Sequence, residues 1–150
     1  MASWAEIERE APEFAARVRE RFEAGTNKTI ATVRRDGAPR ISGSELAFSS
    51  GQVTLGMMAG SMKLLDVRRD PRVAVHSPTL EPPATGEWPG DAKLAGRLVE
   101  IVAPNREGPA GAHFRVDITE VVLTYVGTPA DHLVVESWHP DRGLVRRIRR

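Results

Sequence analysis

Cysteine is absent from the 150-residue sequence. Its absence excludes disulfide scaffolds, thiolate zinc sites, iron–sulfur clusters and cysteine nucleophiles, because each of these needs a thiol or a thiolate ligand. Any redox chemistry that this protein performs must therefore come from a cofactor.

An excess of charge of one sign is also missing, since 21 lysines and arginines stand against 20 aspartates and glutamates. This balance is not that of a disordered polyelectrolyte or of a protein that coats nucleic acid. No segment comes near the roughly 18 uninterrupted apolar residues of a membrane span. The chain also starts with MASWAEIEREAPEF, which is acidic where a signal peptide is basic. We therefore expect a soluble cytoplasmic protein that partners neither a membrane nor a nucleic acid.

The length suits one ordinary domain with a real core, and we expect a single domain over residues 1–150. Its first segment is typical of a helix. Ser3 and Glu6 have the spacing of a capping box, and apolar residues follow every three or four positions up to Phe22. Pro12 predicts a kink or two shorter helices, because proline cannot donate the internal hydrogen bond.

From Lys28 onward the pattern changes to that of strands. Asp36-Gly37 is a dipeptide that tolerates the positive backbone angles of a tight hairpin turn. A short helix capped by Ser61 is expected over 62–70, and proline-rich loops over 78–90 and 104–111. The predicted strands cover 28–35, 38–48, 52–58, 72–77, 92–103, 113–126 and 132–138. The fold is therefore predicted to be mainly β (α+β), a barrel of six or seven antiparallel strands with an N-terminal helix and one short inserted helix.

Several familiar catalytic and metal-binding motifs are missing. The four histidines form no HxH or HxxxH pair, and no serine lies in a G-x-S-x-G elbow. Neither a Walker loop nor a G-x-G-x-x-G segment follows a strand. We therefore expect no metal site, and we name no catalytic acid, base or nucleophile.

The tetrapeptide Gly60-Ser61-Met62-Lys63 is the most informative segment. A strand ends, a glycine permits a sharp turn, and Ser61 caps a helix whose first backbone N–H groups are unpaired. Lys63 adds a positive charge beside those groups, as in an anion-binding site. The alternative is a plain serine cap with a solvated lysine.

Residues 31–77 resemble the first half of the pyridoxamine 5'-phosphate oxidase-like family, the flavin-binding split β-barrels. The family's D/E-x-G-x-P turn, S-x-K segment and N/D-P-R-V segment have counterparts here, in the same order. They are Asp36-Gly37-Ala38-Pro39, Ser61-Met62-Lys63 and Asp70-Pro71-Arg72-Val73. Residues 93–101 extend the likeness with the family's next strand.

The resemblance implies a homodimer in which both chains build the groove for each of two flavins. The turn with Ser61 and Lys63 would hold the phosphate, and the ring system would lie along the strands that contain Thr32, Ser42 and Ser44. Met57 would line the floor of the groove. The resemblance also brings Trp138 and Arg147 to the partner subunit's flavin, although Trp138 is equally suited to plug the dimer core.

Two positions depart from the family pattern. Ser42 and Met62 stand where the true oxidases carry phosphate-binding arginines, and each such charge-assisted hydrogen bond contributes about 1.5–3 kcal/mol. Pyridoxamine phosphate is therefore not the expected substrate. A related branch of the family binds the deazaflavin coenzyme F-420, whose tail is a phosphodiester bearing glutamates. The arginines from Arg142 to Arg150 are suited to that polyanion, or are simply a solvated end.

We therefore expect a flavoprotein, dependent on FMN or coenzyme F-420, that transfers hydride to or from an unknown small molecule. The alternative is a protein of the same fold that binds flavin or haem without turnover, with His76 or His113 as the haem ligand. A third hypothesis is a dimeric regulator whose flavin groove is empty.

Overall fold

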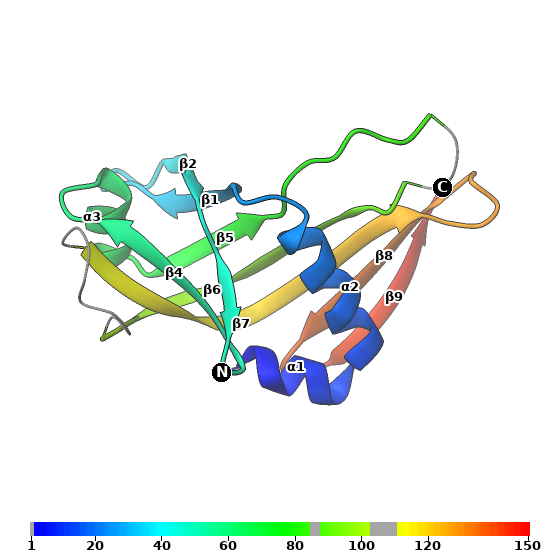
Figure 1. Cartoon of the computed structure of the whole chain (residues 1–150), viewed down its shortest axis with the longest axis horizontal. Helices are drawn as coiled ribbons and strands as arrows, with labels where there is room; N and C mark the ends of the chain where they lie inside the picture. Colours follow the sequence, from blue (N-terminus) through cyan, green and yellow to red (C-terminus); the bar gives the residue numbers. More distant parts are fainter. Residues whose placement is uncertain (1, 85–87, 103–110) are drawn as a thin grey trace.

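The computed structural model describes residues 2–84, 88–102 and 111–150, in which nine strands form one sheet and three helices pack against it (Figure 1). The strands are β1 (Lys28–Val33), β2 (Pro39–Ser44), β3 (Ala47–Ser49), β4 (Gln52–Met58), β5 (Arg72–His76), β6 (Asp91–Ile101), β7 (Gly111–Val126), β8 (Leu133–His139) and β9 (Gly143–Arg149). In these ranges no helix is long and apolar enough to cross a membrane.

Two helices precede the sheet, α1 (Trp4–Glu10) and α2 (Pro12–Glu23). The Ser3 hydroxyl accepts the Glu6 N–H and caps α1, as the capping-box spacing predicts. Pro12 occupies the first turn of α2, where its missing N–H costs nothing, so the chain breaks into two helices at this point. The predicted break is confirmed.

The sheet runs in the order β2-β1-β5-β6-β7-β4-β3, and all its strand pairs are antiparallel. The first part of β7 pairs with β4, and its last part pairs with β8, which in turn pairs with β9. The strands therefore form a split barrel on one side and a wing, made of the end of β7 with β8 and β9, on the other. Figure 1 shows α1 and α2 beside this wing and α3 (Met62–Arg69) at the far end of the barrel.

Nine strands are present where six or seven were predicted. The segment 38–48 is divided into β2 and β3, because the chain leaves the sheet at Glu45 and Leu46 and returns antiparallel to β4. The arginine-rich tail forms β9, which pairs with β8 along its whole length. The residue pattern of this tail does not by itself predict a strand. The turn at Arg142 brings the tail beside β8, and the pairing with β8 makes it a strand.

The predicted hairpin turn is present but longer. Gly37 has φ of +89°, as the dipeptide requires, and the Arg34 N–H donates to the Ala38 carbonyl oxygen at 2.8 Å. β1 ends at Val33, so Arg34 and Arg35 lie in the turn and not in the strand. The described residues of the predicted 78–90 loop contain no helix or strand, whereas residues 103–110, which hold nearly all of the other predicted loop, lie outside the described ranges.

Candidate functional site

The α3 turn is the connection from the end of β4 to the start of α3. Gly60 adopts φ of +79°, which an L-residue with a side chain rarely does, and the Ser61 N–H donates to the Met58 carbonyl oxygen at 3.2 Å. The Ser61 hydroxyl then accepts the Leu64 N–H at 3.3 Å. The predicted capped helix is therefore confirmed.

Lys63 reaches from this turn to β2. Its Nζ donates to the Gly43 carbonyl oxygen at 2.6 Å. β2 ends the sheet order and pairs only with β1, so the backbone along its outer edge has no strand partner in the described chain. The ammonium keeps two further N–H donors, which lie beside this free edge and the start of α3.

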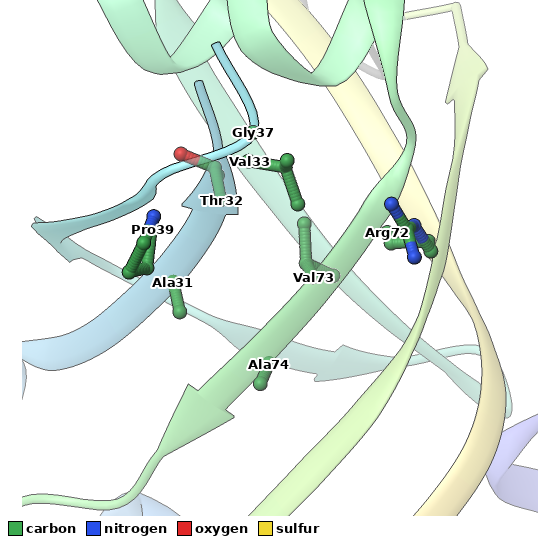
Figure 2. Close-up of a pocket in the computed structure, with 8 residues that line it drawn as sticks. All are labelled: Ala31, Thr32, Val33, Gly37, Pro39, Arg72, Val73 and Ala74. Carbon is green, nitrogen blue, oxygen red and sulfur yellow. The ribbon is translucent and has the colours of Figure 1, made fainter. Parts of the chain in front are cut away.

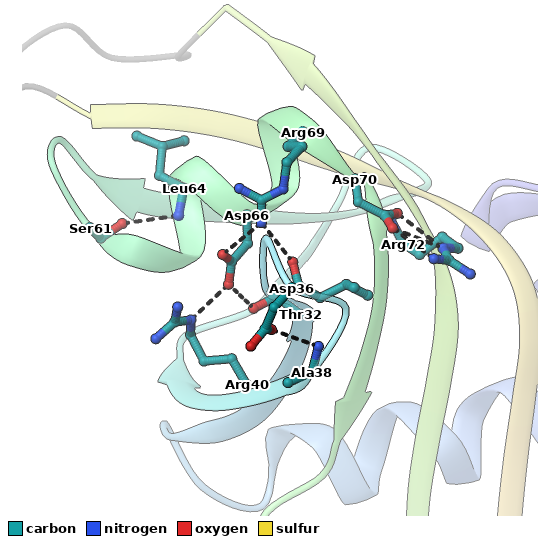
Figure 3. A network of polar contacts seen from close by, with 11 residues as sticks. Thr32, Asp36, Ala38, Arg40, Ser61, Leu64, Asp66, Arg69, Asp70 and Arg72 are labelled. Atoms are coloured by element: carbon teal, nitrogen blue, oxygen red, sulfur yellow. Dashed lines mark hydrogen bonds and ion pairs between the residues drawn. The ribbon is translucent and has the colours of Figure 1, made fainter.

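A buried carboxylate, Asp66, anchors α3 on the barrel (Figure 3). Its Oδ2 accepts hydrogen bonds from Thr32 Oγ1 of β1 at 2.8 Å and from Arg40 Nε of β2 at 2.7 Å. Its Oδ1 accepts one from the Arg69 guanidinium at 3.2 Å. Burial by itself raises the pKa of this carboxyl, but the hydrogen bonds from Arg40 and Thr32 outweigh it, and the pKa lies below its ordinary value.

The Asp66 contacts tie one face of α3 to two strands that precede it in the chain. They set the position of the helix, and therefore of Ser61 and Lys63 at its start. Asp66 was not expected from the sequence. The available signal was that it is the only acid in α3 and stands between Leu64 and Val67, the two buried apolar residues of that helix.

A hollow of about 200 Å³ lies between the chain that follows β2 and the outer side of β4. Gly56 brings no side chain to this hollow, and a Cβ at this position would stand 3.4 Å from Cε1 of His113. Within the described part of the chain the His113 imidazole has no hydrogen-bond partner. The hollow is lined by Glu45, Leu46, Ala47, Thr54, Leu55, Gly56 and His113.

A second groove, of about 250 Å³, crosses β1, the β1–β2 turn and β5 (Figure 2). Its walls are mainly small or apolar side chains, among them Ala31, Val33, Pro39 and Ala74. Such a surface offers contact area and few polar groups.

The structure brings three of the residues predicted for a cofactor close together: Ser61 and Lys63 at the α3 turn, and Ser42, which precedes the Gly43 carbonyl that Lys63 contacts. Ser44 lies on the same strand, and its hydroxyl donates to the Glu45 carbonyl oxygen at 3.1 Å. Thr32 is buried, and its hydroxyl is engaged by Asp66.

Met57 is buried in the core, whereas its neighbour Met58 is 71% exposed. The alternation of β4 turns Met57 into the barrel and Met58 out of it. Met58 therefore lies on the same outer side of β4 as the hollow.

Trp138 belongs to β8 and Arg147 to β9. Figure 1 shows these two strands on the opposite side of the molecule from α3. Trp138 is 1% exposed, and its Nε1–H donates to the Glu10 carboxylate at 2.9 Å. Arg147 is exposed on β9. Within one chain these two residues are separated from the α3 turn.

His76 closes β5, with its Nδ1 2.6 Å from the Ser77 carbonyl oxygen and its Nε2 3.5 Å from the Asp91 carboxylate. Within residues 2–84, 88–102 and 111–150, no group of three histidines or carboxylates is placed to hold a metal ion.

The chain's tertiary structure is similar to several solved structures. A pyridoxamine 5'-phosphate oxidase-related, FMN-binding protein from Nostoc punctiforme matches with a TM-score of 0.64 and 12% identity, over 100% of this chain and 98% of its own. An F-420 reductase matches with a TM-score of 0.54 and 15% identity, over 68% and 93%. HutZ, the haem storage protein from Vibrio cholerae, matches with a TM-score of 0.56 and 10% identity, over 78% and 95%. No protein-family model and no curated protein matches the sequence. At these identities the likenesses show a shared fold.

Proposed function

We propose that this chain, which has the split β-barrel fold of the pyridoxamine 5'-phosphate oxidase-like proteins, is a homodimeric oxidoreductase of the cytoplasm that uses FMN or coenzyme F-420. It would transfer hydride to or from a small organic molecule. The observation that carries the proposal is the α3 turn, where Ser61 and Lys63 stand against the free edge of β2 and are held there by Asp66.

The residues of the α3 turn fit an anionic group. Lys63 has two N–H donors left after its bond to Gly43, and the start of α3 adds unpaired backbone N–H groups. The unpaired backbone of β2 is suited to hydrogen-bond the polar edge of a flat ring, and Gly56 leaves room for its face. When bound, the flavin or deazaflavin supplies the hydride chemistry, while the protein supplies position and excludes water.

The two departures from the family's arginines are not compensated within the described site. Arg40, two residues before Ser42, points its guanidinium to Asp66 and forms an ion pair there. Met62 is exposed and offers no donor. Lys63 is therefore the main cation of the α3 turn, which favours a weakly held FMN or a cofactor whose anionic tail extends further.

The dimer is supported by a row of small side chains across the outer face of four strands. Cross-strand pairing places Ala31 of β1 opposite Ile41 of β2 on one side and Ala74 of β5 on the other, and Ala74 opposite Ala95 of β6. Ile41 is 74% exposed at the end of this flat row. A second copy seated on it would bury this isoleucine and let the strands approach closely.

A second chain also accounts for the distance, within one chain, between the wing and the α3 turn. Because β8 and β9 lie on the opposite side of the molecule from α3, Trp138 and Arg147 on these strands would serve a flavin in the partner's groove. We propose this role for the exposed Arg147. Trp138 is packed against α1 and would support β8 and not contact the flavin.

The second candidate function is haem binding without turnover. His113 favours it over His76, because its imidazole is unpaired in the described chain and faces a hollow, whereas the imidazole of His76 lies against the Ser77 carbonyl and Asp91. The structural likeness to HutZ is consistent with this candidate.

Cofactor titration tests the proposal. The purified protein is titrated with FMN, coenzyme F-420 and haem, and binding is followed by ring fluorescence or by absorbance. Lys63→Ala should weaken binding of the flavin or deazaflavin roughly 10- to 100-fold, because it removes a charge-assisted hydrogen bond. Its melting temperature should fall by no more than about 4 °C.

Arg9→Ala is the matched control, since it removes one exposed positive charge from α1 and should leave binding unchanged. Absence of binding by both flavins at tens of micromolar would contradict the proposal. Haem binding that is lost in His113→Ala would establish the second candidate instead.

A further inference from the structure

The end of α3 opposite the α3 turn also borders a hollow, which we call the arginine groove. It measures about 500 Å³, and its charged lining consists of five arginines and a single aspartate, namely Arg34, Arg35, Arg69, Arg72, Arg97 and Asp70. The whole chain, by contrast, has a formal net charge of only +1. Positive charge is therefore concentrated at this hollow.

Three separate segments contribute these arginines. Arg34 and Arg35 come from the β1–β2 turn, and Arg69 and Arg72 flank the Asp70-Pro71 corner between α3 and β5. Arg97 lies on β6, directly opposite Arg72 in the pairing of β5 with β6. Like charges at directly opposed positions destabilise a sheet, and the Asp70 carboxylate, which Arg72 binds and on which the charge of Arg97 also acts, offsets part of this cost.

Two of the five arginines are neutralised at least in part by the protein. Arg72 binds Asp70 through two nitrogen atoms, with Nε 3.0 Å from Oδ1 and a terminal nitrogen 2.7 Å from Oδ2, as Figure 3 shows. This hydrogen bonding lowers the pKa of Asp70 to about 2, so the carboxylate is charged at neutral pH. Arg69 donates to the Val33 carbonyl oxygen and shares Asp66 with Arg40.

The other three arginines have no such hydrogen-bonded partner. Within the described ranges, the side chains of Arg34, Arg35 and Arg97 make no hydrogen bond or ion pair, and Arg97 acts on Asp70 only through its charge. The nearest acid of the β1–β2 turn, Asp36, turns its carboxylate to the Ala38 N–H at 3.0 Å. Three guanidinium groups from two elements thus line one hollow with their donors free.

We propose that the arginine groove binds a small oligoanion, a compound with several negative charges a few ångströms apart, such as a polyphosphate chain or an oligocarboxylate. A planar guanidinium donates two parallel hydrogen bonds to one phosphate or carboxylate, so several of them suit adjacent anionic groups. A hollow of about 500 Å³ lies in the size range of small-molecule sites. A nucleic acid would need a longer basic surface.

The arginine groove is separate from the α3 turn. α3 has eight residues, and a helix of that length spans about 12 Å, so Lys63 and Arg72 stand at opposite ends of it. The groove and the α3 turn share no lining residue, so variants can test the two proposals separately, and either proposal can fail without the other.

Calorimetric titration with tripolyphosphate, at low and constant ionic strength, tests the inference. The double variant Arg34→Ala/Arg97→Ala removes two exposed, unpaired side chains and should weaken binding about 100-fold, or roughly tenfold for each arginine. The matched control Arg9→Ala/Arg17→Ala removes the same charge from α1 and α2, outside every proposed site. We expect it to weaken binding less than about threefold.

Equal weakening in the two double variants would overturn the inference, because it would mean diffuse attraction to net charge. Loss of tripolyphosphate binding in Lys63→Ala alone would also overturn the inference, because the anion would then lie at the α3 turn. A failure of tripolyphosphate to bind the wild-type protein at millimolar concentration would overturn it as well. Titration with triglutamate separates the two sources of the ligand. Tighter binding of triglutamate indicates an oligocarboxylate, and tighter binding of tripolyphosphate indicates a phosphate chain.

Discussion

At the scale of single residues, Asp66 combines three hydrogen bonds, from Thr32, Arg40 and Arg69, in a buried position. A buried carboxylate is tolerated only when its charge is compensated, and here two guanidinium groups and a hydroxyl do so. The reverse also holds. Without Asp66, a half-buried Arg40 and a buried Thr32 hydroxyl lose their partner.

We predict that Asp66→Ala lowers the free energy of unfolding by about 2–4 kcal/mol at pH 7, somewhat less than for a fully buried ion pair because Arg40 and Arg69 reach solvent. Urea unfolding measures it. The exposed Asp141→Ala should change the same quantity by less than about 0.5 kcal/mol, and equal losses in the two variants would contradict the role given to Asp66.

The pH dependence supplies a second readout of the same change. The pKa of Asp66 is lowered by folding, so its stabilising contribution is present above the ordinary value of 3.8 and is lost as the pH falls through the lowered value. The difference in unfolding free energy between the wild type and Asp66→Ala should therefore shrink below about pH 4. A constant difference down to pH 2 would indicate a packing defect instead.

At the scale of elements, the two ends of the short helix α3 border different proposed sites. Its start is capped by Ser61 and carries Lys63, and its end leads through Asp70-Pro71 into β5. A helix of eight residues is not stable by itself, so both ends depend on the cap and on the Asp66 anchor.

Two substitutions of Ser61 separate capping from anion binding. Ser61→Ala removes the cap and should lower the free energy of unfolding by about 1 kcal/mol. Ser61→Asp keeps a capping oxygen and should preserve stability, but its negative charge should abolish binding of FMN or coenzyme F-420. Urea unfolding and cofactor titration of both variants measure the two effects. If the Ser61→Asp variant still binds the flavin, the flavin phosphate does not lie at this turn.

At the scale of the whole molecule, one chain leaves the barrel face with Ile41 exposed and the wing with Arg147 far from α3. In the dimer that we propose, a second copy would cover Ile41 and bring Arg147 to a groove. The site proposed for the flavin would then be incomplete in one chain.

We predict that the protein is a dimer and that Ile41→Glu shifts it to a monomer, because a carboxylate buried in an apolar contact must be desolvated. Light scattering after size exclusion measures the mass. Leu144→Glu, on exposed β9, is the matched control and should remain dimeric. A wild-type protein that is monomeric at tens of micromolar would contradict the dimer.

The sequence by itself determined the features that depend on neighbours along the chain. The two helices divided at Pro12, the glycine turn at Gly37 and the Ser61 cap follow from backbone chemistry within a few residues, and all three are present. The resemblance of residues 31–77 to a known family also pointed to the fold, because each of its motifs spans only a few neighbouring residues.

Only the tertiary structure decided which distant residues meet. Thr32 and Arg40 reach Asp66 across 34 and 26 positions, and the arginine groove draws on three segments between Arg34 and Arg97. The tail became β9 because β8 offered it an open edge, and Trp138 turned inward because α1 covers it. Each of these outcomes depends on strand order and on the packing of α1 and α3, which hydrophobic period and capping signals do not encode.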